Sequence, residues 1–306
     1  MSKLQHPSVE PKADYHSGFI GLIGKPNVGK STMLNYFLER KIAITSPVPQ
    51  TTRHRLLGIL TRPDAQIVFI DSPGWHKPEH PLGRHMATVT KGVLEEADIL
   101  TVVIDATSGI TKDDEHIFDH LRRLKRPALL AVNKMDLINK PKVLPLLEQC
   151  AALNLFQDQI PISAVTGDNM PTLLNELVTR LPQGPRWFEP DQVTDQTTEL
   201  MIREFIREGA LQATRQEVPH AVGVLLDELT DKGTLTVIHA TILVEREGQK
   251  AILIGKKGQM LKKIGTACRG ELERWLGHRV FLGLWVKVAK DWRNNPVILQ
   301  ELGYLP

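Results

Sequence analysis

Residues 24–32 read Gly-Lys-Pro-Asn-Val-Gly-Lys-Ser-Thr, and this stretch decides how the rest of the chain is interpreted. An apolar run of strand length, residues 18–23, comes just before it, and residues 33–38 carry apolar side chains at helical spacing just after it. A strand, a Gly-x-x-x-x-Gly-Lys-Ser loop and a helix in this order are typical of a phosphate-binding P-loop. Taken alone, the same residues also fit an ordinary turn before a helix. The remaining motifs of the sequence must therefore distinguish a P-loop from such a turn.

The chemistry of the loop suits a nucleoside triphosphate. Gly24 and Gly29 allow the backbone to turn its N–H groups toward phosphate oxygens at a helix N-terminus. In such a loop Lys30 reaches the β- and γ-phosphates, and the Ser31 hydroxyl is a ligand of Mg²⁺. We therefore expect every residue of the loop to contribute to nucleotide binding: Gly24, Lys25, Pro26, Asn27, Val28, Gly29, Lys30, Ser31 and Thr32.

Length and composition indicate a folded protein of two domains. The chain has 306 residues, of which 42% are hydrophobic and 24% charged. This hydrophobic fraction is sufficient to form hydrophobic cores. Its net charge of +3 means that nucleic-acid binding would depend on local clusters of charge. Cys150 and Cys268 are the only cysteines and give no disulfide framework, which fits a reducing compartment. Residues 1–17 lack an apolar stretch, so we expect a polar N-terminal tail on a cytoplasmic protein.

A loop rich in Thr, Ser and Pro, residues 42–55, follows the P-loop helix. A threonine in such a loop can place its hydroxyl on Mg²⁺ when a γ-phosphate is present and withdraw it afterwards. We assign this role to Thr52, although a threonine in a loop is more often only part of the loop.

The next motif follows two short strands, residues 56–60 and 67–70, that are joined by a hairpin-like turn. The second strand runs into Asp71-Ser72-Pro73-Gly74, all four of which we expect at the nucleotide. A carboxylate at the end of a buried strand holds Mg²⁺ through water, and a glycine N–H senses the γ-phosphate. The predicted metal ligands are therefore Ser31, Thr52 and, through water, Asp71.

Trp75 stands where many GTPases have a glutamine that orients the attacking water. An indole cannot do this, so the catalytic group is unknown, and the candidates for stabilising the transition state are Lys30, Asn27, Thr52 and Gly74. One hypothesis is that Asn27 holds a monovalent cation, K⁺, near the phosphates. Trp75 itself also fits a hydrophobic anchor on a loop.

Residues 133–136, Asn-Lys-Met-Asp, follow the second of two near-continuous apolar runs, residues 99–104 and 128–132, which are typical of buried parallel strands. The Asp136 carboxylate only accepts hydrogen bonds, so it can accept from both N–H groups on the Watson–Crick edge of guanine. Adenine offers an acceptor there, and a site of this kind rejects the wrong ligand by roughly 10⁴-fold. We expect the base to be contacted by Asn133, Lys134, Met135 and Asp136, and by the loop Ser163, Ala164 and Val165 after a further short strand.

Two polar clusters in the first half are assigned structural roles. Asp113, Asp114 and Glu115 follow Thr111 in the manner of a helix-capping box, so they are not read as a catalytic pair. His116 and His120 share a helix face but have no third ligand in register, which favours a solvated face over a zinc site.

The order of these motifs resembles the signature of a translation-factor-class GTPase. Each motif comes at the carboxyl end of an expected strand, where open α/β sheets bind ligands. We therefore expect an α/β fold of the P-loop NTPase (Ras-like) type over residues 18–181, with a mostly parallel sheet covered by helices on both faces.

A proline-rich linker, residues 182–197, separates this domain from a second one, residues 198–306. The second domain is expected to be smaller and of the α+β class. Its helices are predicted over 202–213 and 261–276, and its strands over 222–226, 236–244 and 281–288.

Residues 255–258, Gly-Lys-Lys-Gly, are expected between a strand-like stretch, residues 251–254, and a helix. They look like the G-x-x-G loop with which KH domains clamp single-stranded RNA. An ordinary basic turn is the commoner meaning of this pattern. However, residues 246–293 contain twelve Lys or Arg and four Asp or Glu, a net charge of +8, which favours a nucleic-acid surface. The predicted RNA-binding residues are Ile254, Gly255, Lys256, Lys257, Gly258, Lys262 and Lys263.

Together, the GTPase motifs, the linker and the basic G-x-x-G module resemble the Era family of bacterial ribosome-assembly GTPases. The resemblance runs from Gly18 to Leu305 and is most distinctive over residues 24–31, 49–55, 133–136, 243–258 and 284–292. Three features depart from the family pattern: Ser72 in place of the usual Thr, Trp75 in place of a common Leu, and a longer N-terminal tail.

The resemblance implies a Ras-like domain and a type II KH domain that binds the 3′ end of small-subunit ribosomal RNA during assembly of the small ribosomal subunit. It further implies GTP, GDP and Mg²⁺ as ligands, a monomer, and a cytoplasmic location with peripheral association with the inner face of the cell membrane. We expect the nucleotide state to control RNA binding.

Two other functions fit part of the pattern. A non-enzymatic RNA-binding scaffold that holds nucleotide only structurally is disfavoured by Lys30, Ser31 and Asp71, but Trp75 leaves it open. A tRNA-modifying GTPase would need a second chemical site, and the sequence offers no cysteine nucleophile or cofactor loop for one.

Overall fold

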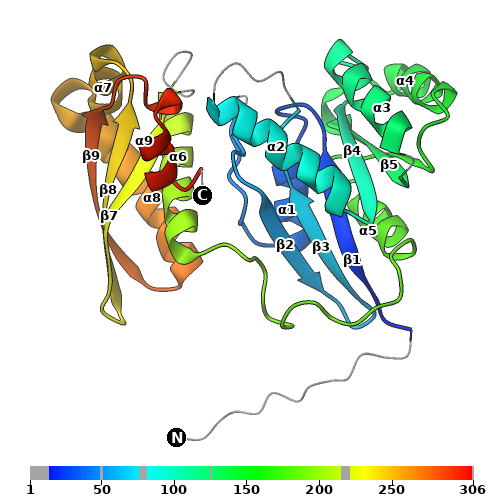
Figure 1. The fold of residues 1–306 in the computed structure, drawn as a ribbon, viewed down its shortest axis with the longest axis horizontal. Coiled ribbons are helices and arrows are strands. Elements are labelled where there is room, and N and C mark those ends of the chain that lie inside the picture. Colours follow the sequence, from blue (N-terminus) through cyan, green and yellow to red (C-terminus); the bar gives the residue numbers. More distant parts are fainter. Residues whose placement is uncertain (1–13, 49–50, 76–80, 125, 215–220, 305–306) are drawn as a thin grey trace, which may run out of the picture.

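The computed structural model describes residues 14–48, 51–75, 81–124, 126–214 and 221–304. It consists of two units that lie side by side and are joined by a segment that runs beneath both (Figure 1). Residues 1–13 of the expected tail, and Pro49 and Gln50 of the expected switch loop, lie outside the described residues.

The first unit is built on a six-stranded sheet in the order β2-β3-β1-β4-β5-β6. Only β2 is antiparallel to its neighbour, and all other pairs are parallel. The strands are β1 (His16–Ile23), β2 (Leu56–Thr61), β3 (Ala65–Asp71), β4 (Ile99–Asp105), β5 (Ala128–Asn133) and β6 (Gln159–Pro161). The central strands are almost continuously apolar because both faces of the sheet are covered.

Helices cover both faces of this sheet (Figure 1). They are α1 (Lys30–Leu38), α2 (Pro81–Glu96), α3 (Lys112–Leu124), α4 (Lys140–Ala152) and α5 (Met170–Val178). Apolar side chains of α1 and α5 pack on one face, and those of α2, α3 and α4 pack on the other. The sheet therefore holds its loops, including the P-loop, at the carboxyl ends of the parallel strands.

The expected tail, residues 1–17, overlaps the first strand by two residues. Strand β1 begins at His16, and the side chains of Tyr15 and Ser17 are buried. The Ser17 hydroxyl donates to the carbonyl of Pro185 at 2.6 Å, and its backbone N–H donates to Pro182. These partners lie more than 160 residues away in the sequence, so the local polar composition gave no sign of them.

The second unit contains a three-stranded sheet in the order β7-β8-β9, with β7 and β8 antiparallel and β8 and β9 parallel. Its elements are α6 (Thr198–Ala213), β7 (Gly223–Asp231), β8 (Leu235–Val244), α7 (Glu247–Ile254), α8 (Gln259–Leu276), β9 (Arg279–Val288) and α9 (Pro296–Glu301). Helices α6 and α8 pack against each other, and their apolar side chains share a core with β7, β8 and β9.

The strand-like stretch expected over residues 251–254 is wrong, because these residues belong to helix α7. The Gln249 side chain accepts the backbone N–H groups of Glu245 and Arg246, which caps the start of the helix. Leu253 is fully buried, so packing on the core overrides the aliphatic, strand-like composition. The Gly-Lys-Lys-Gly loop therefore connects two helices.

The two units are packed together around a small apolar cluster. Leu82 and Met86 of α2 contact Trp292, Leu299 and Tyr304 of the C-terminal segment, which lies between the units in Figure 1. All five side chains are buried, so this contact excludes solvent between the two units. In the part of the chain that the structure describes, none of the helices is both long and apolar enough to cross a membrane.

Candidate functional site

The loop between β1 and α1 has the geometry that phosphate binding needs. Gly29 lies at φ 103° and Asn27 at φ 62°, both in the left-handed region, and α1 begins at Lys30. A Cβ at Gly29 would lie 2.2 Å from the Nδ2 atom of Asn133, and one at Gly24 would lie 2.4 Å from the carbonyl oxygen of Val103. Glycine is therefore required at both positions for the loop to close around a ligand.

Lys30 is a buried cation at the centre of this loop. Its Nζ donates to the carbonyl oxygens of Gly24 and Lys25 at 3.0 and 3.1 Å. Burial lowers the pKa of Lys30 to about 8, although the nearby Asp71 carboxylate opposes this shift. A bound phosphate would restore the charged form, so the site suits an anion.

Three oxygen-bearing side chains converge beside Lys30. The Ser31 hydroxyl donates to Oδ2 of Asp71 at 2.7 Å, and the Thr52 hydroxyl lies 3.1 Å from that of Ser31 and 3.4 Å from Oδ2 of Asp71. Burial raises the pKa of Asp71, against the influence of Lys30, Ser31 and Thr52, and its Oδ1 atom is buried without a hydrogen-bond partner among the described residues. A buried carboxylate with an unpaired oxygen next to two hydroxyls fits Mg²⁺, which prefers oxygen ligands.

The base-recognition residues form a second group. Asn133, at the end of β5, donates to the carbonyl of Val28 at 2.7 Å and accepts the N–H of Ala164 at 3.0 Å, so it links the P-loop to the loop after β6. The Ser163 hydroxyl donates to Oδ1 of Asp136 at 2.6 Å. Lys134 pairs with Oδ2 of Asp105 at 2.6 Å. The Asp136 carboxylate is thereby held at the rim of the same site.

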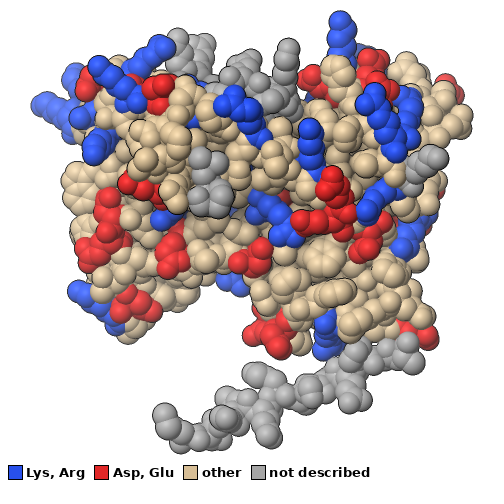
Figure 2. Space-filling view, viewed as in Figure 1, with Lys and Arg blue, Asp and Glu red and all other residues tan. Residues whose placement is uncertain are grey.

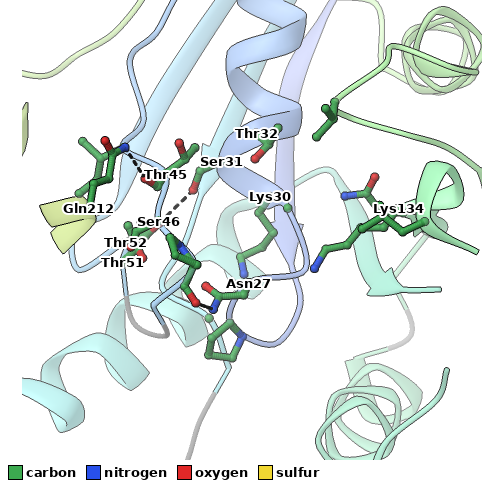
Figure 3. A pocket seen from close by; sticks show the side chains of 18 of the residues that line it. Asn27, Lys30, Ser31, Thr32, Thr45, Ser46, Thr51, Thr52, Lys134 and Gln212 are labelled. Atoms are coloured by element: carbon green, nitrogen blue, oxygen red, sulfur yellow. Dashed lines mark hydrogen bonds between the residues drawn. The ribbon is translucent and has the colours of Figure 1, made fainter. Parts of the chain in front are cut away.

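Residues of both groups line one cavity of about 690 Å³. Figure 3 shows Lys30 and Ser31 at the start of α1, with Lys134 on one side and Thr45, Thr52 and Gln212 on the other. The expected nucleotide-binding residues that line the cavity are Pro26, Asn27, Gly29, Lys30, Ser31, Thr32, Gly74, Asn133, Lys134, Asp136 and Val165. Those that do not line it are Gly24, Lys25, Val28, Asp71, Ser72, Pro73, Met135, Ser163 and Ala164.

Some of these residues have structural partners instead. The Lys25 ammonium pairs with the fully buried Asp114 at 3.0 Å and also contacts the hydroxyls of Ser108 and Thr111. Asp114 therefore does more than cap α3, because it also ties the helix to the P-loop. The Ser72 hydroxyl donates to the carbonyl of Leu22 at 2.9 Å inside the protein, a contact that braces β3 against β1.

Trp75 is anchored close to the P-loop. Its backbone N–H donates to the carbonyl of Gly24 at 3.0 Å, and its indole ring packs on His120, with 5.1 Å between ring centroids. The side chain also contacts the apolar cluster under α3. Trp75 thus fixes the chain just after Gly74, whose own position is tight because a Cβ there would lie 2.6 Å from the backbone nitrogen of Pro26.

The sequence did not point to several residues of the cavity. Ile44, Thr45, Ser46 and Pro47 line it from the loop after α1, and Gln212 lines it from α6 of the second unit. The Gln212 amide donates to the carbonyl of Thr45 at 3.4 Å (Figure 3). The Thr- and Ser-rich loop was a weak signal for the first four, but nothing in the sequence around Gln212 indicated a contact with a site more than 160 residues away.

The Gly-Lys-Lys-Gly loop presents its lysines to solvent. Gly255, Lys257 and Gly258 all have positive φ, at 70°, 52° and 77°, which turns the chain sharply between α7 and α8. Lys256 and Lys257 are exposed, as are Lys262 and Lys263 on α8. Figure 2 shows Lys and Arg side chains gathered at the end of the second unit that carries α7, with Asp and Glu side chains farther down over its sheet. The basic surface is therefore local, as a site for a polyanion requires.

Comparisons with known proteins agree with both halves of this description. Residues 19–134 match the family described as 50S ribosome-binding GTPase, and residues 217–293 match the KH domain family. The chain is 40% identical to the protein in a crystal structure of Era in complex with MgGDPNP and nucleotides 1506–1542 of 16S ribosomal RNA. That match covers 95% of this chain and 100% of the other, with a TM-score of 0.92. A structure of a point variant of Aquifex aeolicus Era bound to GDP.AlF4⁻ matches with the same identity, coverage and TM-score.

These matches confirm the expected fold class. The first unit is a P-loop GTPase with a mostly parallel sheet, and the second is a smaller KH domain with a three-stranded sheet.

Proposed function

This chain belongs to the Era family of GTPases, and we propose from its site that it binds and hydrolyses GTP and binds the 3′ end of small-subunit ribosomal RNA. The observation that carries the proposal is one cavity that joins a phosphate loop, an oxygen cluster suited to Mg²⁺ and a carboxylate suited to guanine. The similar Era structures contain MgGDPNP, GDP.AlF4⁻ and a 16S ribosomal RNA fragment, which supports the same ligands here.

In the GTP-bound state, Ser31 and Thr52 would hold Mg²⁺ directly and Asp71 would hold it through water. When bound, the ion supplies positive charge to the β- and γ-phosphate oxygens. Lys30 adds a second positive charge, and backbone N–H groups of residues 27–31 bind and orient the phosphates. The Asp136 carboxylate accepts from guanine and makes the site selective for it.

The group that positions the attacking water is a separate question, because Trp75 occupies the place of a glutamine and packs on His120. The candidates for stabilising the transition state are Lys30, Asn27, Thr52 and Gly74. Of these, Asn27 has the most suitable chemistry for holding K⁺. Its amide nitrogen donates to the carbonyl of Pro47 at 2.6 Å, and the carbonyl oxygen of the same amide is the type of ligand that a hard cation takes.

We expect phosphate release from GTP to be slow and to be faster in K⁺ than in Na⁺, because a cation of the right size at Asn27 would stabilise charge that develops on the phosphates. Steady-state phosphate release in the two salts, with and without ribosomal RNA, is the measurement. The Asn27→Ala variant is expected to lose the difference between the salts.

Equal turnover of the parent chain in K⁺ and Na⁺ would exclude the cation at Asn27 but leave the GTPase intact. Absence of phosphate release in either salt, even with RNA, would favour the alternative function, a scaffold that binds RNA and holds nucleotide without hydrolysing it.

We further propose that the RNA-binding surface comprises Ile254, Gly255, Lys256, Lys257, Gly258, Lys262 and Lys263. The sharp turn at Gly255–Gly258 allows a phosphate backbone to approach closely, and the exposed lysines neutralise it. A role in assembly of the small ribosomal subunit follows from the RNA to which the similar Era structure is bound.

The remaining expectations are proposals that rest on the family resemblance. They are a division into a GTPase domain over 18–181, a linker over 182–197 and a KH domain over 198–306, a monomeric state, and a cytoplasmic location with peripheral contact to the inner face of the cell membrane. Helix α5 ends at Val178 and α6 begins at Thr198, which supports the placement of the linker.

A further inference from the structure

Helix α6 of the KH domain runs along the loop that contains Thr52. At one end of this loop, the backbone N–H of Thr45 donates to Oε1 of Glu208 at 2.9 Å, and the carbonyl of Thr45 accepts from Gln212 at 3.4 Å. Glu208 is 2% exposed and also pairs with Lys41 at 2.6 Å. Both backbone polar groups of Thr45 are therefore held by one face of α6.

The other end of the loop, residues 51–53, is held by two arginine side chains. The guanidinium of Arg207 donates to the carbonyl oxygen of Thr51, the residue just before Thr52. On the other side of Thr52, the guanidinium of Arg53 donates to the carbonyl of Val222 at 2.7 Å and to the hydroxyl of Tyr304 at 3.2 Å. Thr52 thus lies between two residues that are each bonded to the second domain.

Both arginines are buried and fixed in orientation. Arg207 is 1% exposed and forms a two-atom contact with the Glu204 carboxylate, at 2.9 and 2.5 Å. Burial would raise the pKa of Glu204, but the facing Arg207 lowers it overall, so the pair is ionised. Arg53 is 3% exposed, and its guanidinium lies 5.7 Å from the ring centroids of both Trp292 and Tyr304. The Glu204 carboxylate holds the Nε and Nη2 atoms of Arg207 along one edge of the guanidinium, which directs Nη2 at the carbonyl of Thr51.

These contacts fix the loop beside the oxygen cluster, which consists of the Ser31 and Thr52 hydroxyls and the Asp71 carboxylate. With Thr51 and Arg53 fixed, the Thr52 hydroxyl lies 3.1 Å from that of Ser31 and 3.4 Å from Asp71. Thr52 is the one residue of this cluster that comes from a loop without helix or strand structure, so its position depends on what holds the loop.

We propose that Arg207 and Arg53 are positioning residues that hold Thr52 at the Mg²⁺ site, so that the KH domain completes the GTP-binding site of the other domain. The inference rests on the proposed function, because it takes Thr52 as a ligand of Mg²⁺ in the GTP-bound state. Since a switch threonine contacts the ion only while a γ-phosphate is present, the contacts of Arg207 favour the GTP-bound form and not the GDP-bound form.

The test is equilibrium binding of a non-hydrolysable GTP analogue and of GDP to the full chain in excess Mg²⁺. Arg207→Lys retains a charge beside Glu204 but lacks the planar fork that reaches Thr51, and Arg207→Ala removes both contacts. We expect each variant to bind the analogue about tenfold more weakly, which is the effect of one lost hydrogen bond from a charged donor, and to bind GDP as the parent does. The Mg²⁺ concentration needed for half-maximal analogue binding is expected to rise in parallel.

Arg203→Ala is the matched control. Arg203 lies one turn earlier on α6, and its guanidinium donates to the carbonyl of Glu301 within the KH domain. This variant should bind the analogue and GDP as the parent does.

Arg207→Lys decides the outcome if Arg207→Ala does not fold. An equal loss of analogue and GDP binding in Arg207→Lys would mean that Arg207 only supports the fold, and unchanged binding of both would mean that Thr52 is positioned without it. Either result overturns the inference. Failure of the parent chain to bind guanine nucleotides would instead overturn the proposed function.

Discussion

Replacement of Asp136 with Asn is expected to lower the affinity for GTP by about 10³-fold, the largest effect that we expect from any single substitution in this protein. In the proposed complex the carboxylate would accept from two N–H groups of guanine. Its Oδ1 atom already accepts from the Ser163 hydroxyl at 2.6 Å. An asparagine keeps the shape but replaces one accepting oxygen with an NH₂ group, so that one of the donors around the carboxylate faces another donor and loses its hydrogen bond.

Titration of the Asp136→Asn variant with GTP, ATP and xanthosine triphosphate measures this effect. Xanthine carries a carbonyl oxygen where guanine carries its amino group, so the introduced amide can donate to it, and the variant is expected to bind the xanthine nucleotide better than the parent does. ATP should bind weakly to both proteins. Undiminished GTP binding by the variant would show that Asp136 does not face the base.

Reversal of charge in the Gly-Lys-Lys-Gly loop, by Lys256→Glu together with Lys257→Glu, is expected to weaken RNA binding by about 10²-fold at low salt. Both lysines are exposed at a turn where the chain leaves room for a phosphate backbone. If each lysine neutralises one phosphate of a single strand, the slope of log K against log salt should fall by about 1.4 in the variant.

The measurement is the affinity for an oligonucleotide from the 3′ end of 16S ribosomal RNA at several salt concentrations. Lys232→Glu is the control, because Lys232 is an exposed lysine in the same domain, in the turn between β7 and β8. The control should bind RNA nearly as the parent does, and GTP binding should be the same in all three proteins. A salt slope that is unchanged in the loop variant would place the RNA elsewhere on the domain.

The sequence could predict those parts of the structure that depend on residues close together in the chain. The P-loop is set by Gly24, Gly29 and Lys30, which lie close together in the sequence, between a strand and a helix. The apolar runs of β4 and β5 identify buried parallel strands because both faces of such strands are covered. Residues 251–254 were misread because Gln249, in the first turn of α7, caps the helix, and apolar composition does not report such a cap.

The parts that sequence could not predict depend on contacts between distant residues. Nothing near Arg207 or Gln212 indicates that α6 contacts the nucleotide side of the molecule, since their partners Thr51 and Thr45 lie 156 and 167 residues away. Likewise, Asp114 was assigned to helix capping, and its pairing with Lys25 appears only when α3 is placed beside the P-loop. Sequence motifs thus predicted the ligands, whereas the contacts between the two units became visible only in the packed structure.

We propose that the nucleotide held in the first domain controls the RNA clamp in the second. The loop around Thr52 contacts α6, and α2, which follows Gly74, packs against the C-terminal segment of the KH domain. Both regions that we expect to border the γ-phosphate therefore touch the second half of the chain.

The most direct test is the dissociation constant of the intact protein for the 3′ end of 16S ribosomal RNA, measured once with a GTP analogue bound and once with GDP. We expect RNA to bind about tenfold more tightly in the analogue state, which is within the usual range of coupling between two sites. Equal affinity in the two nucleotide states would contradict control of the RNA clamp by the nucleotide.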